Sequence, residues 1–464
     1  KLITESCFHL HKILDSVSGM LALVLMLFLL TIFALVSSNC DPMAPFPLVC
    51  ESFLLTSLIA LSNVIGTPVD ISFGTSLFIV SVLAAFALSF FFGSAYGTTI
   101  AGKQYSNYVV ILRLPKKKIT FIYLIFCVFI LYLGIQNAIS TALSVSVNAD
   151  YSNMMEYNRA ASVHGTIESR NMALTLVSFF VQVSGYFYSY LLIQKIVIGE
   201  EKVGTSLLQS KLEMIVILVS LLISALGSGR TFMLQYICFV FIAAYYLNIF
   251  KSKRTRLGLN RLFSVIKRMF VAFVIFFAVF QTLGLLTGKT GKSSWDEMLF
   301  GYSGAAIIAL DRSLEVYKPD NRFFGEETFF GFYGLLNACG ISVPNDIHFL
   351  PFVSVGKGKS TNIYTALRTY YYDFGLVGVY IIECLIGFFA GIAYHLLRKW
   401  GGHPIYLMLY SFLIYGIAMQ GIGEYLIRFV LSISQLVYII IFSLLVLLYG
   451  KRTLFAQYEH RSVR

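Results

Sequence analysis

Two arginines stand out in this sequence because each lies beside residue types that bind anions. Arg230 follows a break rich in glycine and serine, Leu226-Gly-Ser-Gly-Arg-Thr231, between two apolar runs. Glycine lets the backbone turn tightly there, and free amides at a helix end favour an anion. Arginine near a bilayer is costly and often functional. The alternative is an interfacial arginine whose side chain reaches the lipid headgroups.

Arg368 lies in a tyrosine-rich stretch, Ser360-Thr-Asn-Ile-Tyr-Thr-Ala-Leu-Arg-Thr-Tyr-Tyr-Tyr-Asp373. Helical spacing predicts one face shared by Arg368, Tyr364 and either Tyr371 or Tyr372. A guanidinium binds two phosphate oxygens at once, and aromatic rings stack on sugar faces, so the cluster suits a sugar phosphate. An interfacial aromatic belt explains some of these tyrosines. The substrate-binding candidates in this stretch are Asn362, Tyr364, Tyr371 and Tyr372.

Four further residues are weaker candidates for binding or proton transfer. Arg159 is either a third phosphate ligand or a solvated loop charge. Arg428 follows Glu424 by four residues, a spacing that predicts a structural ion pair, although both residues could instead line a cavity. His348 and Asp373 are candidate proton acceptors, and histidine has a pKa suited to that task.

Other charged residues and missing motifs limit the chemistry. Asp311, Arg312 and Glu315 predict a salt-bridged helix surface, and Glu326-Glu327 could favour the start of the next helix. The sequence contains no Walker A loop, no HExxH, no metal-spaced cluster of His and Cys, and no GxSxG elbow. We therefore expect neither a metal nor another cofactor.

The composition indicates an integral membrane protein. Hydrophobic residues make up 58% of the 464 residues and charged residues only 12%, too few charges to cover a soluble surface. The continuous apolar runs argue against a transmembrane β-barrel and predict an all-α, polytopic chain with about eleven spans. The predicted spans are 20–37, 47–65, 73–92, 119–135, 172–198, 212–227, 232–250, 269–286, 371–397, 404–422 and 426–449.

The distribution of Lys and Arg predicts the orientation. The strongest basic run, Lys251-Ser-Lys-Arg-Thr-Arg256, should be cytoplasmic, as should Lys116-Lys117-Lys118, Arg398-Lys399 and Lys451-Arg452. The N-terminus then lies outside and the C-terminus inside. The predicted parts are an N-terminal bundle of about eight helices over 1–286, a large outer loop over 287–370, and C-terminal helices with a cytoplasmic tail over 371–464.

The outer loop should contain structure of its own. Ser294-Trp-Asp-Glu297 has the spacing of a capping box, and an amphipathic helix should follow over Met298–Val316. Lys318-Pro-Asp-Asn321 indicates a turn. An apolar helix over Thr328–Ala338 should stop at Gly340, and it would lie along the membrane surface or dip into it.

These pieces together resemble the bacterial oligosaccharide repeat-unit polymerases of the O-antigen polymerase (Wzy) type. The most specific part is the stretch Asn362-Ile-Tyr-Thr-Ala-Leu-Arg-Thr-Tyr-Tyr-Tyr-Asp-Phe-Gly375 followed by Gly378, and the second is Gly227-Ser-Gly-Arg-Thr231. Many relatives read Gly-Ser-Arg, so the additional glycine shifts the register of Arg230. In architecture the resemblance covers nearly the whole chain.

The resemblance implies a metal-independent glycosyltransferase, related to O-antigen ligases, on the periplasmic face of the bacterial inner membrane. Such enzymes move a growing glycan from undecaprenyl diphosphate onto a new lipid-linked repeat unit, making O-antigen or capsule. Arg230 and Arg368 match the family's outer-face arginines, which would stabilise the diphosphate as it leaves. The implied partners are the lipid-linked oligosaccharide, membrane lipids, a chain-length regulator and a flippase, but no nucleic acid. The alternatives are a ligase, a flippase or other transporter, and a non-enzymatic scaffold.

Overall fold

The chain is mostly helical in the computed structural model, as its long apolar runs require. Lipid offers no hydrogen-bond partners, so a chain that crosses it must satisfy its backbone internally, as a helix does. Six of the described helices are long and apolar enough to cross a membrane, so the chain is an all-α, multi-pass membrane protein. The structure describes residues 19–62, 70–101, 108–151, 153–158, 172–197, 210–226, 231–252, 299–316, 323–343, 350–356, 358–400 and 403–454.

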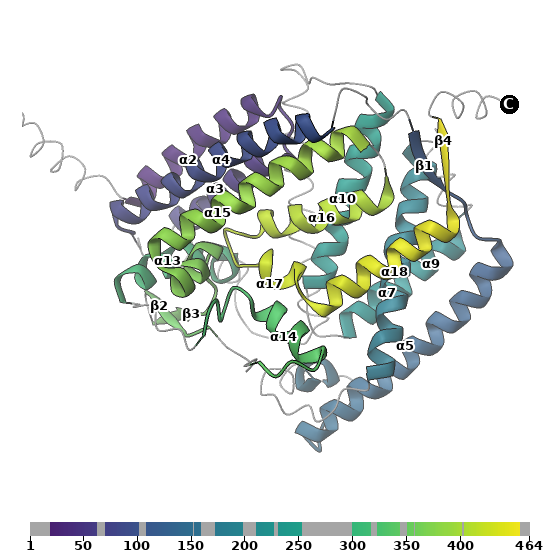
Figure 1. Cartoon of the computed structure of the whole chain (residues 1–464). Coiled ribbons are helices and arrows are strands. Elements are labelled where there is room, and N and C mark those ends of the chain that lie inside the picture. The colour runs from purple at the N-terminus through teal and green to yellow at the C-terminus, as the bar shows by residue number, and fades with distance from the viewer. Residues whose placement is uncertain are drawn as a thin grey trace, which may run out of the picture. The chain divides into compact units, whose positions relative to one another are not determined.

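The long helices follow the apolar runs closely. The predicted spans 20–37, 172–198 and 232–250 correspond to α2, α7 and α10 within two residues at each end. The six helices, shown in Figure 1, are α2 (Gly19–Ser37), α4 (Phe73–Ala101), α5 (Lys117–Val145), α7 (Met172–Val197), α10 (Thr231–Ser252) and α15 (Ala366–Trp400).

Four other predicted spans contain helices shorter than the roughly 20 residues of a straight crossing. The span predicted over 426–449 is wrong as a single helix, because it consists of α17 (Ile427–Val430) and α18 (Ile433–Tyr449). The span predicted over 269–286 lies outside the described residues, so the count of about eleven stays a prediction. The remaining short helices are α3 (Pro45–Leu61), α9 (Lys211–Leu226) and α16 (Pro404–Ala418).

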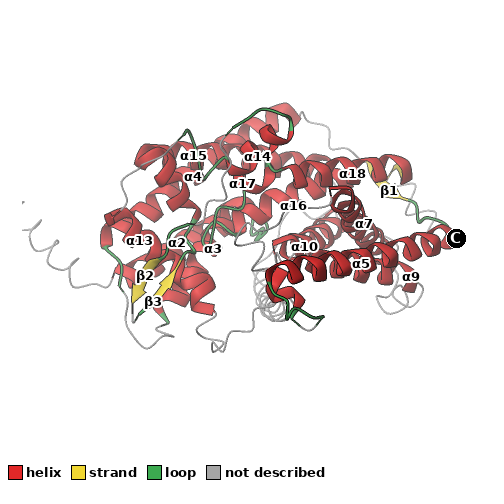
Figure 2. Cartoon of the chain, turned by 90° about the horizontal axis from the view of Figure 1, so that it is seen from below, coloured by secondary structure: helices red, strands yellow, loops and turns green. Residues whose placement is uncertain are grey.

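The large loop predicted over 287–370 contains the expected helices. A π-helical turn, η1 (Phe300–Gly304), leads into α13 (Ala305–Val316). The apolar helix α14 (Phe330–Ala338) ends before Gly340, which has a φ of +84°. A hairpin follows, formed by β2 (Val353–Gly356) and β3 (Lys359–Thr361), and Figure 2 shows it in yellow. The predicted capping box over 294–297 and the turn over 318–321 lie outside the described residues.

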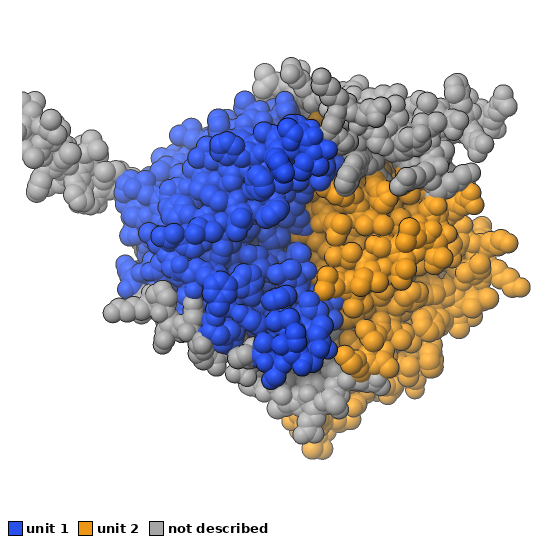
Figure 3. Space-filling view, viewed as in Figure 1, with its two compact units in different colours: residues 1–103, 292–396, 413–433 blue, residues 104–291, 397–412, 434–464 orange. Residues whose placement is uncertain are grey.

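The described helices belong to two compact units, and each unit combines three segments that are separate in the sequence (Figure 3). Unit 1 comprises residues 1–103, 292–396 and 413–433, and unit 2 comprises 104–291, 397–412 and 434–464. This grouping differs from the three parts predicted from the sequence, which divide the chain after residues 286 and 370. All of the described candidate site residues belong to unit 1.

In unit 1, glycines bring the backbones of α4 and α15 into close contact. A Cβ atom added to Gly93 would collide with the backbone of Phe388, and one at Gly387 would lie 2.5 Å from the carbonyl oxygen of Phe86. Small residues at such positions allow close helix packing where lipid provides no hydrophobic driving force. This packing fixes the long part of α15, and with it the position of the site at the beginning of that helix.

In unit 2, two segments far apart in sequence pair as strands. β1 (Tyr108–Leu112) is antiparallel to β4 (Gly450–Leu454). The pairing places the start of the C-terminal tail next to the segment that precedes Lys116. Basic residues follow β1 at Lys116-Lys117-Lys118 and lie in β4 at Lys451-Arg452, and the pairing agrees with their predicted location on one side of the membrane.

The core of unit 2 contains paired polar side chains. Gln235 and Gln435 are both buried, and each donates its amide N–H to the other, over 3.0 and 2.9 Å. The hydroxyl of Tyr438 donates to the amide oxygen of Gln182. Because a buried polar group is costly without a partner, these pairs allow polar side chains to lie inside an apolar bundle.

Candidate functional site

The arginine and tyrosine cluster forms the beginning of α15, and a break at Gly375 separates it from the rest of the helix. Gly375 has φ +66° and ψ −171°, a conformation that is essentially confined to glycine. Residues 366–374 therefore form a short helix, and residues 376–400 form the long one. The predicted span 371–397 is wrong in this respect, because its helix begins at Ala366 and contains the break.

Arg368 lies between two tyrosine rings. Its guanidinium carbon is 4.8 Å from the ring centroid of Tyr364 and 4.8 Å from that of Tyr372. Cation–π attraction strengthens where water is excluded, and Arg368 is only 1% exposed. The predicted shared face is thus confirmed for these three residues, although Tyr364 precedes the helix.

The charge of Arg368 is balanced by Glu327. Nη1 of Arg368 donates a hydrogen bond to Oε2 of Glu327, which is also buried. Pairing offsets part of the cost of removing both charges from water. The interpretation of Glu327 as a helix-start charge for α14 is wrong, because its side chain pairs with Arg368, and α14 has no side-chain cap.

Asp373 holds the turn that carries Glu327. Its Oδ1 accepts the backbone N–H of Glu327 over 3.2 Å, and its Oδ2 accepts that of Thr328 over 2.6 Å. Residues 323–329 are therefore attached to the short helix at two points, the ion pair of Arg368 and the carboxylate of Asp373. A role of Asp373 as general base stays a prediction, and it would require this turn to release the carboxylate.

A second buried carboxylate, Glu424, lies between α16 and α17. Its Oε1 accepts the N–H groups of Leu426 and Ile427, over 3.0 and 2.7 Å. Its Oε2 accepts the N–H of Arg428 over 2.8 Å. The hydroxyl of Tyr370 also donates to Oε1 over 3.1 Å. Burial raises the pKa of Glu424, and these hydrogen bonds oppose the rise.

Arg428 binds an aromatic ring of α14. The predicted side-chain ion pair between Arg428 and Glu424 is wrong, because the carboxylate caps the backbone of α17 instead. The guanidinium carbon lies 4.6 Å from the ring centroid of Phe330. A Cβ atom at Gly331 would collide with the carbonyl oxygen of Arg428, so glycine permits the close contact of α14 with α17.

Glu383 is a third carboxylate that sequence reasoning missed. It is fully buried in the long part of α15, and the amide Nε2 of Gln420 lies 3.1 and 3.4 Å from its two oxygens. The backbone oxygen of Gln420 also accepts the N–H of Ala366 over 2.8 Å. The segment between α16 and α17 therefore contacts both parts of α15. A carboxylate inside the apolar run 371–397 was the available signal.

The other predicted site residues are placed differently. Tyr371 is half-buried and does not share the ring contacts of Arg368. Asn362 is half-buried between β3 and α15. Arg159, Arg230 and His348 lie outside the described residues, so their roles stay predictions.

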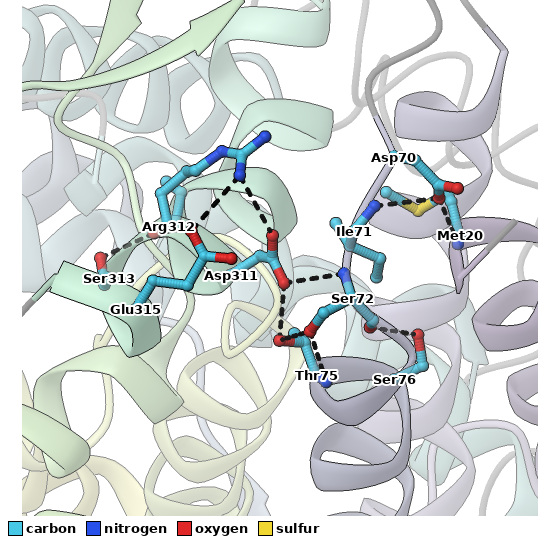
Figure 4. Close-up of polar contacts among 11 residues, drawn as sticks. Met20, Asp70, Ile71, Ser72, Thr75, Ser76, Asp311, Arg312, Ser313 and Glu315 are labelled. Atoms are coloured by element: carbon cyan, nitrogen blue, oxygen red, sulfur yellow. Dashed lines mark hydrogen bonds and ion pairs between the residues drawn. The ribbon is translucent and has the colours of Figure 1, made fainter. Parts of the chain in front are cut away.

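Asp311 has a structural task at the beginning of α4 (Figure 4). Its Oδ1 accepts the backbone N–H of Ser72 over 3.0 Å and the hydroxyl of Thr75 over 2.7 Å. This carboxylate therefore supplies the acceptors that the first turn of a helix needs. The predicted salt-bridged surface is confirmed for Arg312 and Glu315, which are exposed and whose Nη1 and Oε2 atoms are 3.4 Å apart. Asp311 is buried, so it is not part of that surface, although its Oδ2 lies 4.0 Å from Nη1 of Arg312.

Comparison of the chain with family models, curated proteins and solved structures found no match. The described side chains and the motif that contains them are therefore the basis for inferring a function. These side chains combine a buried guanidinium between aromatic rings with four buried carboxylates. The carboxylates belong to Glu327, Asp373, Glu383 and Glu424.

Proposed function

We propose that the chain is a glycan polymerase, which transfers a growing oligosaccharide from undecaprenyl diphosphate onto a new lipid-linked repeat unit. The observation that carries the proposal is Arg368, held between the rings of Tyr364 and Tyr372 in the stretch that resembles the polymerase motif. A fixed guanidinium offers paired donors to phosphate oxygens. Adjacent aromatic rings offer flat apolar faces to a sugar.

In the proposed reaction a hydroxyl oxygen of the acceptor sugar bonds to the anomeric carbon of the donor. The bond from that carbon to the diphosphate oxygen breaks, and the electron pair leaves with the diphosphate. Arg368, together with Arg230, stabilises this developing negative charge. The hydroxyl proton passes to Asp373, to His348 or to solvent. Glu327, the present partner of Arg368, has to give up its position when the diphosphate binds.

The proposal also includes a location and partners. The site would face the periplasm at the inner membrane of a bacterium, where lipid-linked repeat units are assembled into O-antigen or capsule. A flippase would supply the substrate, and a chain-length regulator would limit the product. No metal and no nucleic acid takes part.

A transporter of lipid-linked oligosaccharides is the second candidate, and Glu383 favours it. Ionisable side chains inside membrane helices often mark ion or proton pathways. Glu383 is fully buried within α15, inside an apolar run that otherwise carries few charges. A transporter requires Glu383 to change its protonation during the cycle, whereas a polymerase requires only that Glu383 and Gln420 remain hydrogen-bonded.

The deciding experiment is a gel of the surface polysaccharide from cells lacking the gene and complemented with variants. For a polymerase, the deletion and Arg368→Ala leave a single repeat unit on the lipid core. Arg368→Lys restores little, because a forked donor becomes a point charge. Arg312→Ala is the matched control, since Arg312 is exposed and paired with Glu315, and it should give the wild-type ladder.

Other outcomes would change the conclusion. Long glycan in cells with Arg368→Ala, at a protein level equal to wild type, would remove Arg368 from the mechanism. Bare core in the deletion strain would favour a ligase or a transporter. Glu383→Gln would then separate these two, because only a transporter driven by protonation of Glu383 should lose translocation of the lipid-linked intermediate while the protein still inserts.

A further inference from the structure

The surface of residues 323–343 carries no charge. The charged residues of this segment are Glu326 and Glu327, and both are buried. A water-facing segment of average composition would be about 25% charged. Its largest exposed side chains are apolar: Phe324 is 72% exposed, Ile341 is 52% exposed and Phe332 is 37% exposed. Such a surface is unfavourable in water and marks a binding face.

The helix α14 within this segment has no buried residue, although its nine residues are mostly apolar. It contacts α17 on one side through Gly331 and through the stacking of Phe330 with Arg428. One side of α14 therefore packs against the protein, and the described residues do not cover its other side.

This apolar surface continues into the outer surface of α15. The ring of Phe324 is 5.1 Å from that of Phe374, and Phe374 in turn is 6.0 Å from Phe329. Directly after the break at Gly375, Leu376 and Val377 are exposed, the second by 70%. They begin the part of α15 that is long and apolar enough to cross a membrane. Their exposed side chains require an apolar solvent.

We propose that residues 323–341 lie at the membrane interface, and that the rings of Phe324 and Phe332 reach into the lipid layer and contact the acyl chains of the bilayer. The absence of surface charge and the ring contact with Phe374 both follow from this location. Arg428, stacked on Phe330, then lies near the headgroups, where its charge remains solvated.

This location has a consequence that rests on the proposed polymerase function. Glu327 follows Phe324 by three residues and is the ion-pair partner of Arg368. A lipid-linked diphosphate would therefore reach Arg368 from the leaflet, past the rings of Phe324, Phe329 and Phe374. The membrane location itself does not depend on the polymerase function.

The test uses single tryptophans in the full-length chain. Trp295→Phe and Trp400→Phe remove the two native tryptophans, and Phe324→Trp introduces the probe. The protein is reconstituted into phosphatidylcholine vesicles whose acyl chains are brominated. The positive control is Leu376→Trp, on the spanning helix. The negative control is Glu315→Trp, since an exposed ion pair such as Arg312–Glu315 has to face water.

We expect bromine to quench the Phe324→Trp probe as strongly as the Leu376→Trp probe, and the Glu315→Trp probe hardly at all. Quenching of Phe324→Trp no greater than that of Glu315→Trp overturns the proposal. Phe332→Trp gives an independent reading if the first variant does not fold, and it should be quenched as well. A failed polymerisation test would leave these outcomes unchanged, so the two proposals fail separately.

Discussion

Arg368 and Glu327 form an ion pair in which each side chain is only 1% exposed. The two residues are 41 positions apart, so the pair fixes the turn of residues 323–329 to the beginning of α15. Such a pair contributes little net stability compared with apolar residues of the same shape, but losing one partner leaves a buried charge unbalanced. In the proposed polymerase, the carboxylate of Glu327 occupies the position that the substrate diphosphate takes when it binds Arg368.

Single substitutions of this pair should be far more damaging than the double substitution. Glu327→Met or Arg368→Met should each lower the free energy of unfolding by about 3–5 kcal/mol, and the combined variant should recover most of the loss. Thermal unfolding in detergent measures the effect. The exposed Glu315, which pairs with Arg312, is the control, where methionine should cost at most about 1 kcal/mol. Additive losses at Arg368 and Glu327 would show that the two charges are not coupled.

The ring of Tyr372, rather than its hydroxyl, should hold Arg368. Tyr372→Phe keeps the aromatic face at 4.8 Å from the guanidinium carbon, so the cation–π contact and the glycan length should be retained. Tyr372→Leu removes the cation–π contact and should cost about 0.5–2 kcal/mol. Thermal unfolding and the polysaccharide ladder report both effects. Tyr371→Leu is the matched control for thermal unfolding, and an equal loss of stability there would argue against a specific stacking role for Tyr372.

The helices were largely predictable from the sequence because lipid leaves a spanning chain few alternatives. The predicted span 20–37 became α2 (Gly19–Ser37), and 172–198 became α7 (Met172–Val197). The contact of Arg368 with Tyr372 was predictable as well, because it follows from helical spacing, whereas Tyr364 reaches Arg368 from before the start of the helix. Local rules of this kind need no knowledge of the rest of the fold.

The partners of the charged residues were not predictable in the same way. Glu327 lies far from Arg368 in sequence, and Gln420 lies 37 positions from Glu383, so no local spacing connects either pair. The local rule even misled at Glu424, where i, i+4 spacing predicted an ion pair with Arg428. The carboxylate instead satisfies the free N–H groups at the start of α17, which a break in the predicted span 426–449 creates.

Glu424 should make the stability of the protein depend on pH. Burial raises its pKa, so the folded protein binds more protons than the unfolded chain between the ordinary glutamate pKa of about 4.3 and the raised value. Stability should therefore fall as pH rises through that window. A glutamine at position 424 does not titrate. The unfolding temperature of the wild type should therefore fall relative to that of Glu424→Gln as pH rises through the window. Parallel curves at every pH above the ordinary glutamate pKa of about 4.3 would exclude this titration.

Gly375 should be essential for its backbone conformation and not for the space around it. Its φ of +66° disfavours any residue with a Cβ atom, while an added Cβ would meet nothing within 4 Å. Gly375→Ala should therefore lower the free energy of unfolding by about 1–3 kcal/mol through strain alone.

Gly301 in η1 is the matched control, since it has equally open space and no positive φ. Gly301→Ala should be neutral or stabilise by up to about 1 kcal/mol. Equal effects at both positions would mean that α15 runs straight through residue 375. The short helix that carries Arg368 and Asp373 would then not turn back toward Glu327 and Thr328.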